Sequence, residues 1–175
     1  MRLWAEERRS GSIELLMTLP VTLWQAVVGK FLAAWAFIIL ALVLTFPLWI
    51  TVNYLGSPDN GVIVAAYIGS WMLAGGFLAI GMCLSAATRN QVIAFITAAL
   101  VGFLFLLAGF PLVLDLVRGV LPEEIVETIA SLSFLTHYEA ISKGVIDLRD
   151  VLYFATLAGF WLVATALVLD MKKGQ

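Results

Sequence analysis

Four long apolar stretches constrain the fold of this chain more than any other feature. They cover residues 23–52, 62–86, 91–114 and 151–169. Each is close to or above the length of about 20 residues that a helix needs to cross the hydrocarbon core of a bilayer. Because 62% of the 175 residues are hydrophobic and only 13% are charged, a soluble domain could not bury so many apolar side chains. We therefore expect an all-α integral membrane protein, with four transmembrane helices bundled in a single domain over residues 1–175.

The connections between these stretches differ greatly in length. The first two are short and rich in turn-forming residues, whereas residues 115–150 form a long, patterned segment. There, Pro122 followed by Glu123 is typical of a helix start, Thr136 with Glu139 forms a capping-box pattern, and Gly144 is a helix stop. We expect two short amphipathic helices here. Pro47 and Pro111 are expected to kink or end the stretches that contain them.

The basic residues favour one orientation in the membrane. With a cytoplasmic N-terminus, seven of the ten lie on the inner side, and positively charged loops favour the cytoplasm. These seven are Arg2, Arg8, Arg9, Lys30, Arg89, Lys172 and Lys173. We expect a multi-pass protein of the plasma or inner membrane with both termini in the cytoplasm.

Residues 1–21 are predicted to form a cytoplasmic segment ahead of the first span. A capping box of Thr22 and Gln25 places the start of that span just after Thr22. Residues 13–19 are amphipathic and predict a helix on the membrane surface, with the charged cluster at 6–9 facing water. The segment is too polar for a cleaved signal peptide, so the first apolar helix is expected to act as an uncleaved signal.

Two motifs resemble known sequences. The stretch "AEERRSGSIELLMTLPVTLWQAVVGKFLA" is similar to the cytoplasmic loop of ABC-2 type transporter permeases. Near the other end, "LSFLTHYEAISKGVIDLRDVLYF" is similar to the segment before the last span of the same family. The residues that carry the first match are Glu6, Glu7, Arg8, Gly11, Ser12, Glu14, Leu15, Leu16, Pro20, Val21, Gly29 and Lys30; those that carry the second are Leu132, Ser133, His137, Tyr138, Gly144, Val145, Ile146, Asp147, Arg149 and Asp150. Within the family, the two motifs resemble those of the branch associated with gliding motility and with copper or nitrous oxide reductase.

The resemblance implies the membrane subunit of an ABC transporter, acting in export and associating as a homodimer or with a longer homologous permease. It implies a coupling helix that binds a separate ABC ATP-binding subunit, formed with Glu6, Glu7, Arg8, Arg9, Gly11, Ser12 and Glu14. It also implies an outer, re-entrant-like segment at 115–150 that closes the pathway, with His137, Gly144, Asp147, Arg149 and Asp150 as its motif. The chain has no phosphate-binding loop of its own, so the nucleotide chemistry is expected in the partner.

The family pattern usually has six spans, of which this sequence matches the last four. The sequence therefore predicts a partial permease that inserts and associates but does not transport with its ATPase alone. A truncated membrane scaffold or assembly protein that does not transport stays open as the alternative.

Other classes of function are less well supported by the residues. Ser70 and His137 could be compared with the serine and histidine of an intramembrane protease, but no second pattern supports the pair. No metal or other cofactor and no nucleic-acid partner is expected. Lys30 is expected to extend from the first span toward the cytoplasmic interface. Three pairs of small residues four apart would allow close helix approach: Gly29 and Ala33, Gly81 and Ser85, Ala155 and Gly159.

Overall fold

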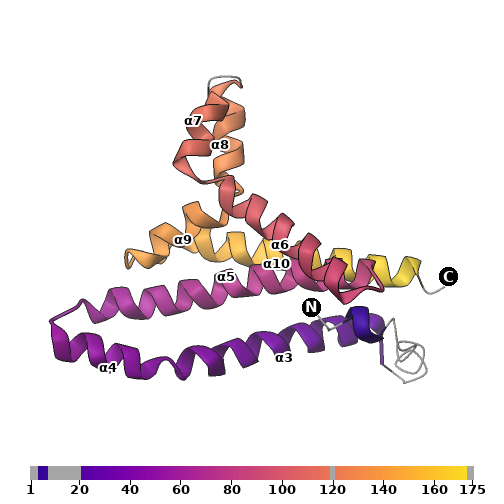
Figure 1. Ribbon diagram of the computed structural model, residues 1–175, viewed down its shortest axis with the longest axis horizontal. Helices are drawn as coiled ribbons and strands as arrows, with labels where there is room; N and C mark the ends of the chain where they lie inside the picture. Colours follow the sequence, from indigo (N-terminus) through magenta and orange to yellow (C-terminus); the bar gives the residue numbers. More distant parts are fainter. Residues whose placement is uncertain (1–3, 8–20, 119–120, 173–175) are drawn as a thin grey trace.

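The computed structural model describes residues 4–7, 21–118 and 121–172, and every regular element in these ranges is helical (Figure 1). Residues 4–7 form a helical turn. The helices that follow are α3 (Leu23–Val43), α4 (Phe46–Leu55), α5 (Asn60–Ala87), α6 (Gln91–Leu107), α7 (Pro111–Arg118), α8 (Glu123–Ser131), α9 (Phe134–Ser142) and α10 (Leu148–Met171). The all-helical membrane fold expected from the apolar stretches is confirmed, with three helical stretches long and apolar enough to span a bilayer, or four if α6 and α7 count as one broken span.

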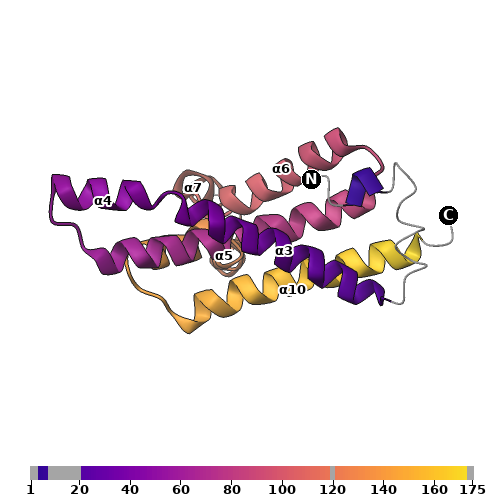
Figure 2. The same ribbon diagram turned by 90° about the horizontal axis from the view of Figure 1, so that it is seen from below.

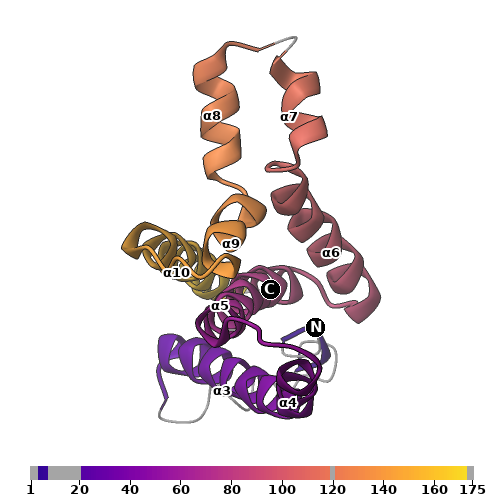
Figure 3. The ribbon, with the colours of Figure 1, turned by 90° about the vertical axis from the view of Figure 1, so that its left-hand side faces the viewer.

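Helix α5 is the centre of the bundle. It packs against α3, α6, α9 and α10 (Figure 3), and α3 also crosses α10 (Figure 2). No residue of α5 is charged, and most of its buried positions hold Gly, Ala or another small side chain. Small residues let helix backbones approach closely inside a membrane, which is why this helix can contact so many neighbours.

A tryptophan pair joins α3 to α5 where such a close approach is needed. The indoles of Trp35 and Trp71 stack with centroids 4.0 Å apart, and each N–H donates to the backbone carbonyl of the other residue, at 3.0 and 3.3 Å. A Cβ at Gly75 would lie only 2.7 Å from Nε1 of Trp35. Glycine at this position therefore makes room for the pair.

The first predicted span, 23–52, is not one straight helix. Helix α3 ends at Val43 and α4 begins at Phe46, with Pro47 in its first turn. Thr45 stabilises the break: its hydroxyl donates to the carbonyl of Leu42 at 2.6 Å and lies 2.7 Å from the hydroxyl of Tyr67 on α5. The prediction that Pro47 interrupts this stretch is confirmed, and the two helices together cover 33 residues from Leu23 to Leu55.

The third predicted span, 91–114, is wrong as a continuous helix. Helix α6 ends at Leu107, and α7 starts at Pro111 after a bend of 71°. The 17 residues of α6 extend about 25 Å at 1.5 Å per residue, which is less than a hydrocarbon core of about 30 Å. Gly109 lies in this bend, and a Cβ there would come 2.3 Å from Oγ of Ser133, so the missing side chain lets the start of α9 approach the bend.

The segment between α6 and α10 holds three short helices in the described residues: α8 and α9 lie where the sequence predicted two helices within 115–150, and α7 begins inside the predicted third span. Helices α7 and α8 stand side by side and project away from the bundle, and α9 lies along α5 (Figures 1 and 3). The predicted start of α8 after Pro122 and the stop at Gly144 are confirmed. The capping box of Thr136 and Glu139 is wrong, since Ser133 caps α9 and Thr136 donates instead to the carbonyl of Ala130.

The bundle has two distinct ends. Residues 4–7, the start of α3, the turn between α5 and α6 and the end of α10 lie at one end (Figure 1), where the Lys172 amine donates to the carbonyl of Ala87. The turn between α4 and α5 lies at the other end, and a Cβ at Gly144 would be 3.1 Å from Val62 at the start of α5. We call these the N-terminal end and the outer end.

Candidate functional sites at the two ends of the bundle

At the N-terminal end, the turn of residues 4–7 is held by the C-terminal part of α5. The hydroxyl oxygen of Ser85 accepts from the backbone N–H groups of Trp4 and Ala5, at 3.3 and 3.0 Å. The first N–H groups of a helical turn have no partner within the turn, so a side chain usually caps them. Here the cap comes from a residue 80 positions later in the chain, and it fixes the turn to α5.

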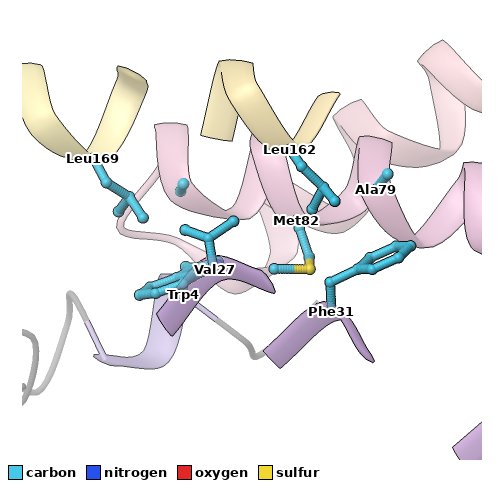
Figure 4. Packing of buried hydrophobic residues seen from close by; sticks show 8 residues of the cluster. Trp4, Val27, Phe31, Ala79, Met82, Leu162 and Leu169 are labelled. Carbon is cyan, nitrogen blue, oxygen red and sulfur yellow. The ribbon is translucent and has the colours of Figure 1, made fainter. Parts of the chain in front are cut away.

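The indole of Trp4 is the largest fully buried side chain in the described residues, with 1% of its surface exposed. It belongs to an apolar cluster in which α3 contributes Val27 and Phe31, α5 contributes Met82 and α10 contributes Leu169 (Figure 4). Fully burying a large aromatic side chain stabilises its position by several kcal/mol, on the order of 3–5 kcal/mol against alanine. The turn is thus seated where three helices meet.

Lys30 of α3 makes two further contacts with the turn of residues 4–7. Its amine forms an ion pair with Glu7 and lies 3.8 Å from the centroid of the Trp4 ring. A cation over an indole face is attracted by the ring quadrupole. The sequence predicted that Lys30 extends toward the cytoplasmic interface. In the structure its amine contacts two residues of the N-terminal turn, Glu7 and Trp4. We call Trp4, Glu7, Lys30 and Ser85 the anchor.

Of the predicted coupling residues, the structure describes only Glu6 and Glu7. Glu6 is exposed, whereas Glu7 is partly buried and turned to Lys30 rather than to water. Arg8, Arg9, Gly11, Ser12 and Glu14, and the predicted surface helix at 13–19, lie outside the described residues. The capping box that starts α3 is confirmed, with Thr22 and Gln25 each accepting from the backbone N–H of the other.

At the outer end, His137 and Asp150 form a buried pair between α9 and α10. Nδ1 of His137 lies 2.6 Å from a carboxylate oxygen of Asp150, and Nε2 lies 3.0 Å from the carbonyl oxygen of Ser131. Both ring nitrogens therefore face acceptors, the carboxylate of Asp150 and the carbonyl of Ser131. Asp150 is itself buried, and a buried carboxylate needs a hydrogen-bonded partner of this kind.

Aromatic rings surround this pair. The His137 ring stacks on Tyr153 with centroids 3.9 Å apart, and the Tyr153 hydroxyl donates to the carbonyl of Leu132. Phe134, fully buried, packs against Phe77 of α5, Phe105 of α6 and Phe154 of α10. The end of α8, helix α9 and the start of α10 are thereby joined into one unit, which we call the outer clip: Ser131, Phe134, His137, Asp150 and Tyr153.

The other residues of the outer motif shape the backbone. Gly144 has a φ of +90°, a conformation that favours glycine, and ends α9. Asp147 caps α10 by accepting from the backbone N–H of Arg149, whose side chain is exposed. The motif thus divides into two clip residues, His137 and Asp150, and backbone-shaping positions that do not join them.

The protease comparison finds no support in this geometry. Oγ of Ser70 lies 3.3 Å from the hydroxyl of Tyr138, while both nitrogens of His137 are engaged by Asp150 and Ser131. A serine nucleophile needs a hydrogen bond to its base, which these two residues do not make.

An apolar groove of about 290 Å³ lies between the break that separates α3 from α4 and the facing part of α5. It is lined by Ile39, Leu42, Val43, Phe46, Trp49, Tyr67, Ile68 and Trp71. Its lining offers no charged group, so it has nothing that would select a charged cargo.

Comparison with known protein families shows which family the chain belongs to. The family model described as "ABC-2 family transporter protein" matches residues 1–171. The chain belongs to the ABC-2 transporter family. This permease is accordingly a membrane component of an ABC transporter, as the two motifs predicted, whereas the branch within the family stays a prediction. No curated protein and no solved structure matches the chain significantly.

The sequence did not indicate that Trp4, the largest fully buried side chain of the described residues, lies in the core of the permease's N-terminal end. Trp4 stands beside charged residues, and its cap, Ser85, lies at the far end of α5. Glu7 and Lys30 carry opposite charges and both belong to the first family motif, but they are 23 positions apart, and no spacing rule pairs them.

Proposed function

We propose that this permease lines the transport pathway of an ABC exporter and receives mechanical work from a separate ATP-binding subunit through residues 1–21. The observation that carries the proposal is the family match over 1–171, combined with an N-terminal turn that is fixed to three helices of the bundle. A segment that contacts a motor subunit must be firmly attached to the helices that it moves. The anchor supplies such an attachment.

The coupling contact itself is assigned to Glu6, Arg8, Arg9, Gly11, Ser12 and Glu14. Glu7 supports this contact indirectly, because its ion pair with Lys30 holds the N-terminal turn on α3. Mixed charges suit a polar contact between proteins, because complementary charges fix the partner and its register. The permease works as a homodimer or beside a longer homologous subunit, with both termini in the cytoplasm. The outer clip then lies on the far side of the plasma or inner membrane and closes the outer end of the pathway.

Reversing the charge of the coupling segment tests this function. In Arg8→Glu combined with Arg9→Glu, we expect the ATP-binding subunit encoded by a neighbouring gene to co-purify at less than about a tenth of the wild-type amount, since like charges across a contact cost several kcal/mol. Membrane insertion should be unchanged. Arg118→Glu at the exposed end of α7 is the matched control and should retain the subunit. Equal recovery from all three proteins would contradict the coupling role and favour the scaffold alternative.

A further inference from the structure

We propose that the anchor is the joint through which movement of residues 8–20 reaches α5 and α10, and not only the helix to which those residues are directly connected. This inference rests on the proposed function, because it takes an ATP-binding subunit to act on that segment. It assigns positioning roles to Trp4, Lys30 and Ser85, none of which is expected to touch the motor subunit.

The first step is that both ends of the coupling segment are fixed. At one end, Glu7 is paired with Lys30 on α3. At the other end, Thr22 caps the first turn of the same helix. The covalent connection at Thr22 leads into α3 alone. Helix α3 in turn packs on α5 and α10, and the turn of residues 4–7 offers a second route to them through its own contacts.

The second step is that this turn contacts the right helices. Its two capped N–H groups bind Ser85 on α5, and Trp4 lies in the cluster that includes Met82 of α5 and Leu169 of α10. The pairing of Lys172 with the carbonyl of Ala87 ties the ends of α5 and α10 together beside it. A push on the turn therefore acts on both helices as a unit.

The third step is that these helices extend to the outer end. Helices α5 and α10 have 28 and 24 residues, and they pack against each other along the bundle. Helix α10 carries Asp150 of the outer clip, and α5 packs against α9, which carries His137. A rigid displacement of α10 against α9 would change the geometry of the His137–Asp150 pair, so the anchor and the clip are the two ends of one connection.

The first arm of the test measures the anchor without any partner. In a Cys83→Ala background, a maleimide should label Ala5→Cys slowly, because Ala5 is fully buried, and Glu6→Cys rapidly, because Glu6 is exposed. Lys30→Met removes the ion pair and the cation over the indole, so labelling at position 5 should become roughly tenfold faster. Lys30→Arg retains both interactions and should label like wild type. Labelling at position 6 should be equal in all variants. An unchanged rate at position 5 in Lys30→Met would overturn the role of Lys30.

The second arm measures transmission in the complex with the ATP-binding subunit, reconstituted in nanodiscs. An environment-sensitive fluorophore on Ser57→Cys, in the exposed outer turn, reports movement on addition of ATP and vanadate. We expect Lys30→Met to bind the subunit like wild type but to lose most of this response, and Lys30→Arg to keep it.

Three results would contradict the proposal, and they differ from one another. A full response in Lys30→Met would show that movement does not pass through the anchor. Loss of the ATP-binding subunit in Lys30→Met would place Lys30 in docking rather than in transmission. Absence of the subunit from the wild-type preparation would overturn the proposed function itself, and with it the transmission, whatever the labelling at position 5 shows.

Discussion

At the scale of single residues, the helix starts and the outer clip depend on polar contacts between partners that are near or far apart along the chain. The capping box of Thr22 and Gln25 is confirmed because both partners lie within one turn of the same helix. The box of Thr136 and Glu139 is wrong because α9 begins three residues earlier than predicted, with Ser133 as its N-cap. The pairing of His137 with Asp150 spans 13 residues and a turn. No spacing rule predicts such a contact, since it depends on how α9 packs on α10.

The buried pair of the outer clip gives a prediction at this scale. Either His137→Asn or Asp150→Asn alone should lower the free energy of unfolding by about 3 kcal/mol, because each change disrupts a buried ionisable pair. The combined change His137→Phe with Asp150→Leu should be less damaging than the sum of the two single changes to the same residues, His137→Phe and Asp150→Leu. Unfolding in a denaturing detergent, analysed as a double-mutant cycle, measures the difference. Strict additivity would show that the two side chains do not interact.

At the scale of helices, the existence of each apolar helix could be predicted, but not which face of it packs. The proline positions correctly marked both interruptions, at Pro47 and Pro111. The small-residue pairs were less informative. A Cβ at Gly29 or at Gly159 would meet nothing within 4 Å, whereas the unpredicted Gly75 lies against Trp35. Helical spacing of small residues indicates where a close approach is possible, and the neighbouring helix decides where it occurs.

Helix approach at Gly75 can be tested against a matched glycine. Gly75→Ala should destabilise the fold by about 1–3 kcal/mol, because the added methyl group would force the Trp35–Trp71 pair apart. Gly29→Ala, on α3 in open space, should be neutral or stabilising by up to about 1 kcal/mol through its helix propensity. The same detergent unfolding assay measures both. If the two substitutions had equal effects, the tryptophan pair would not be what holds α3 against α5.

At the scale of the whole molecule, three of the basic residues that the sequence assigned to one side of the membrane lie at one end of the bundle. Lys30, Arg89 and Lys172, all assigned to the inner side from the sequence, lie in the N-terminal half of α3, in the turn between α5 and α6, and at the end of α10. What could not be predicted is the connection between the ends. It depends on α5 contacting α3, α9 and α10 at once, and a linear pattern does not contain those contacts.

The orientation of the bundle is a prediction at this scale. In intact cells, in a Cys83→Ala background, a membrane-impermeant maleimide should label Ser57→Cys in the exposed outer turn and should not label Ser10→Cys. After permeabilisation, position 10 should become reactive. Labelling of Ser10→Cys in intact cells would place the N-terminal end outside and reverse the assignment of both ends.

Site-specific photo-crosslinking in native membranes tests the coupling function most directly, because it requires no knowledge of the cargo. A photoreactive amino acid at Arg9 or Ser12 should form a crosslink to the ATP-binding subunit, and the same group at Ser57 in the outer turn should not. The crosslink should persist in Lys30→Met, where docking is retained. A crosslink to the ATP-binding subunit from Ser57, or the absence of a crosslink from all three positions, would contradict the account. The N-terminal segment would then not be the site where the ATP-binding subunit acts on this permease.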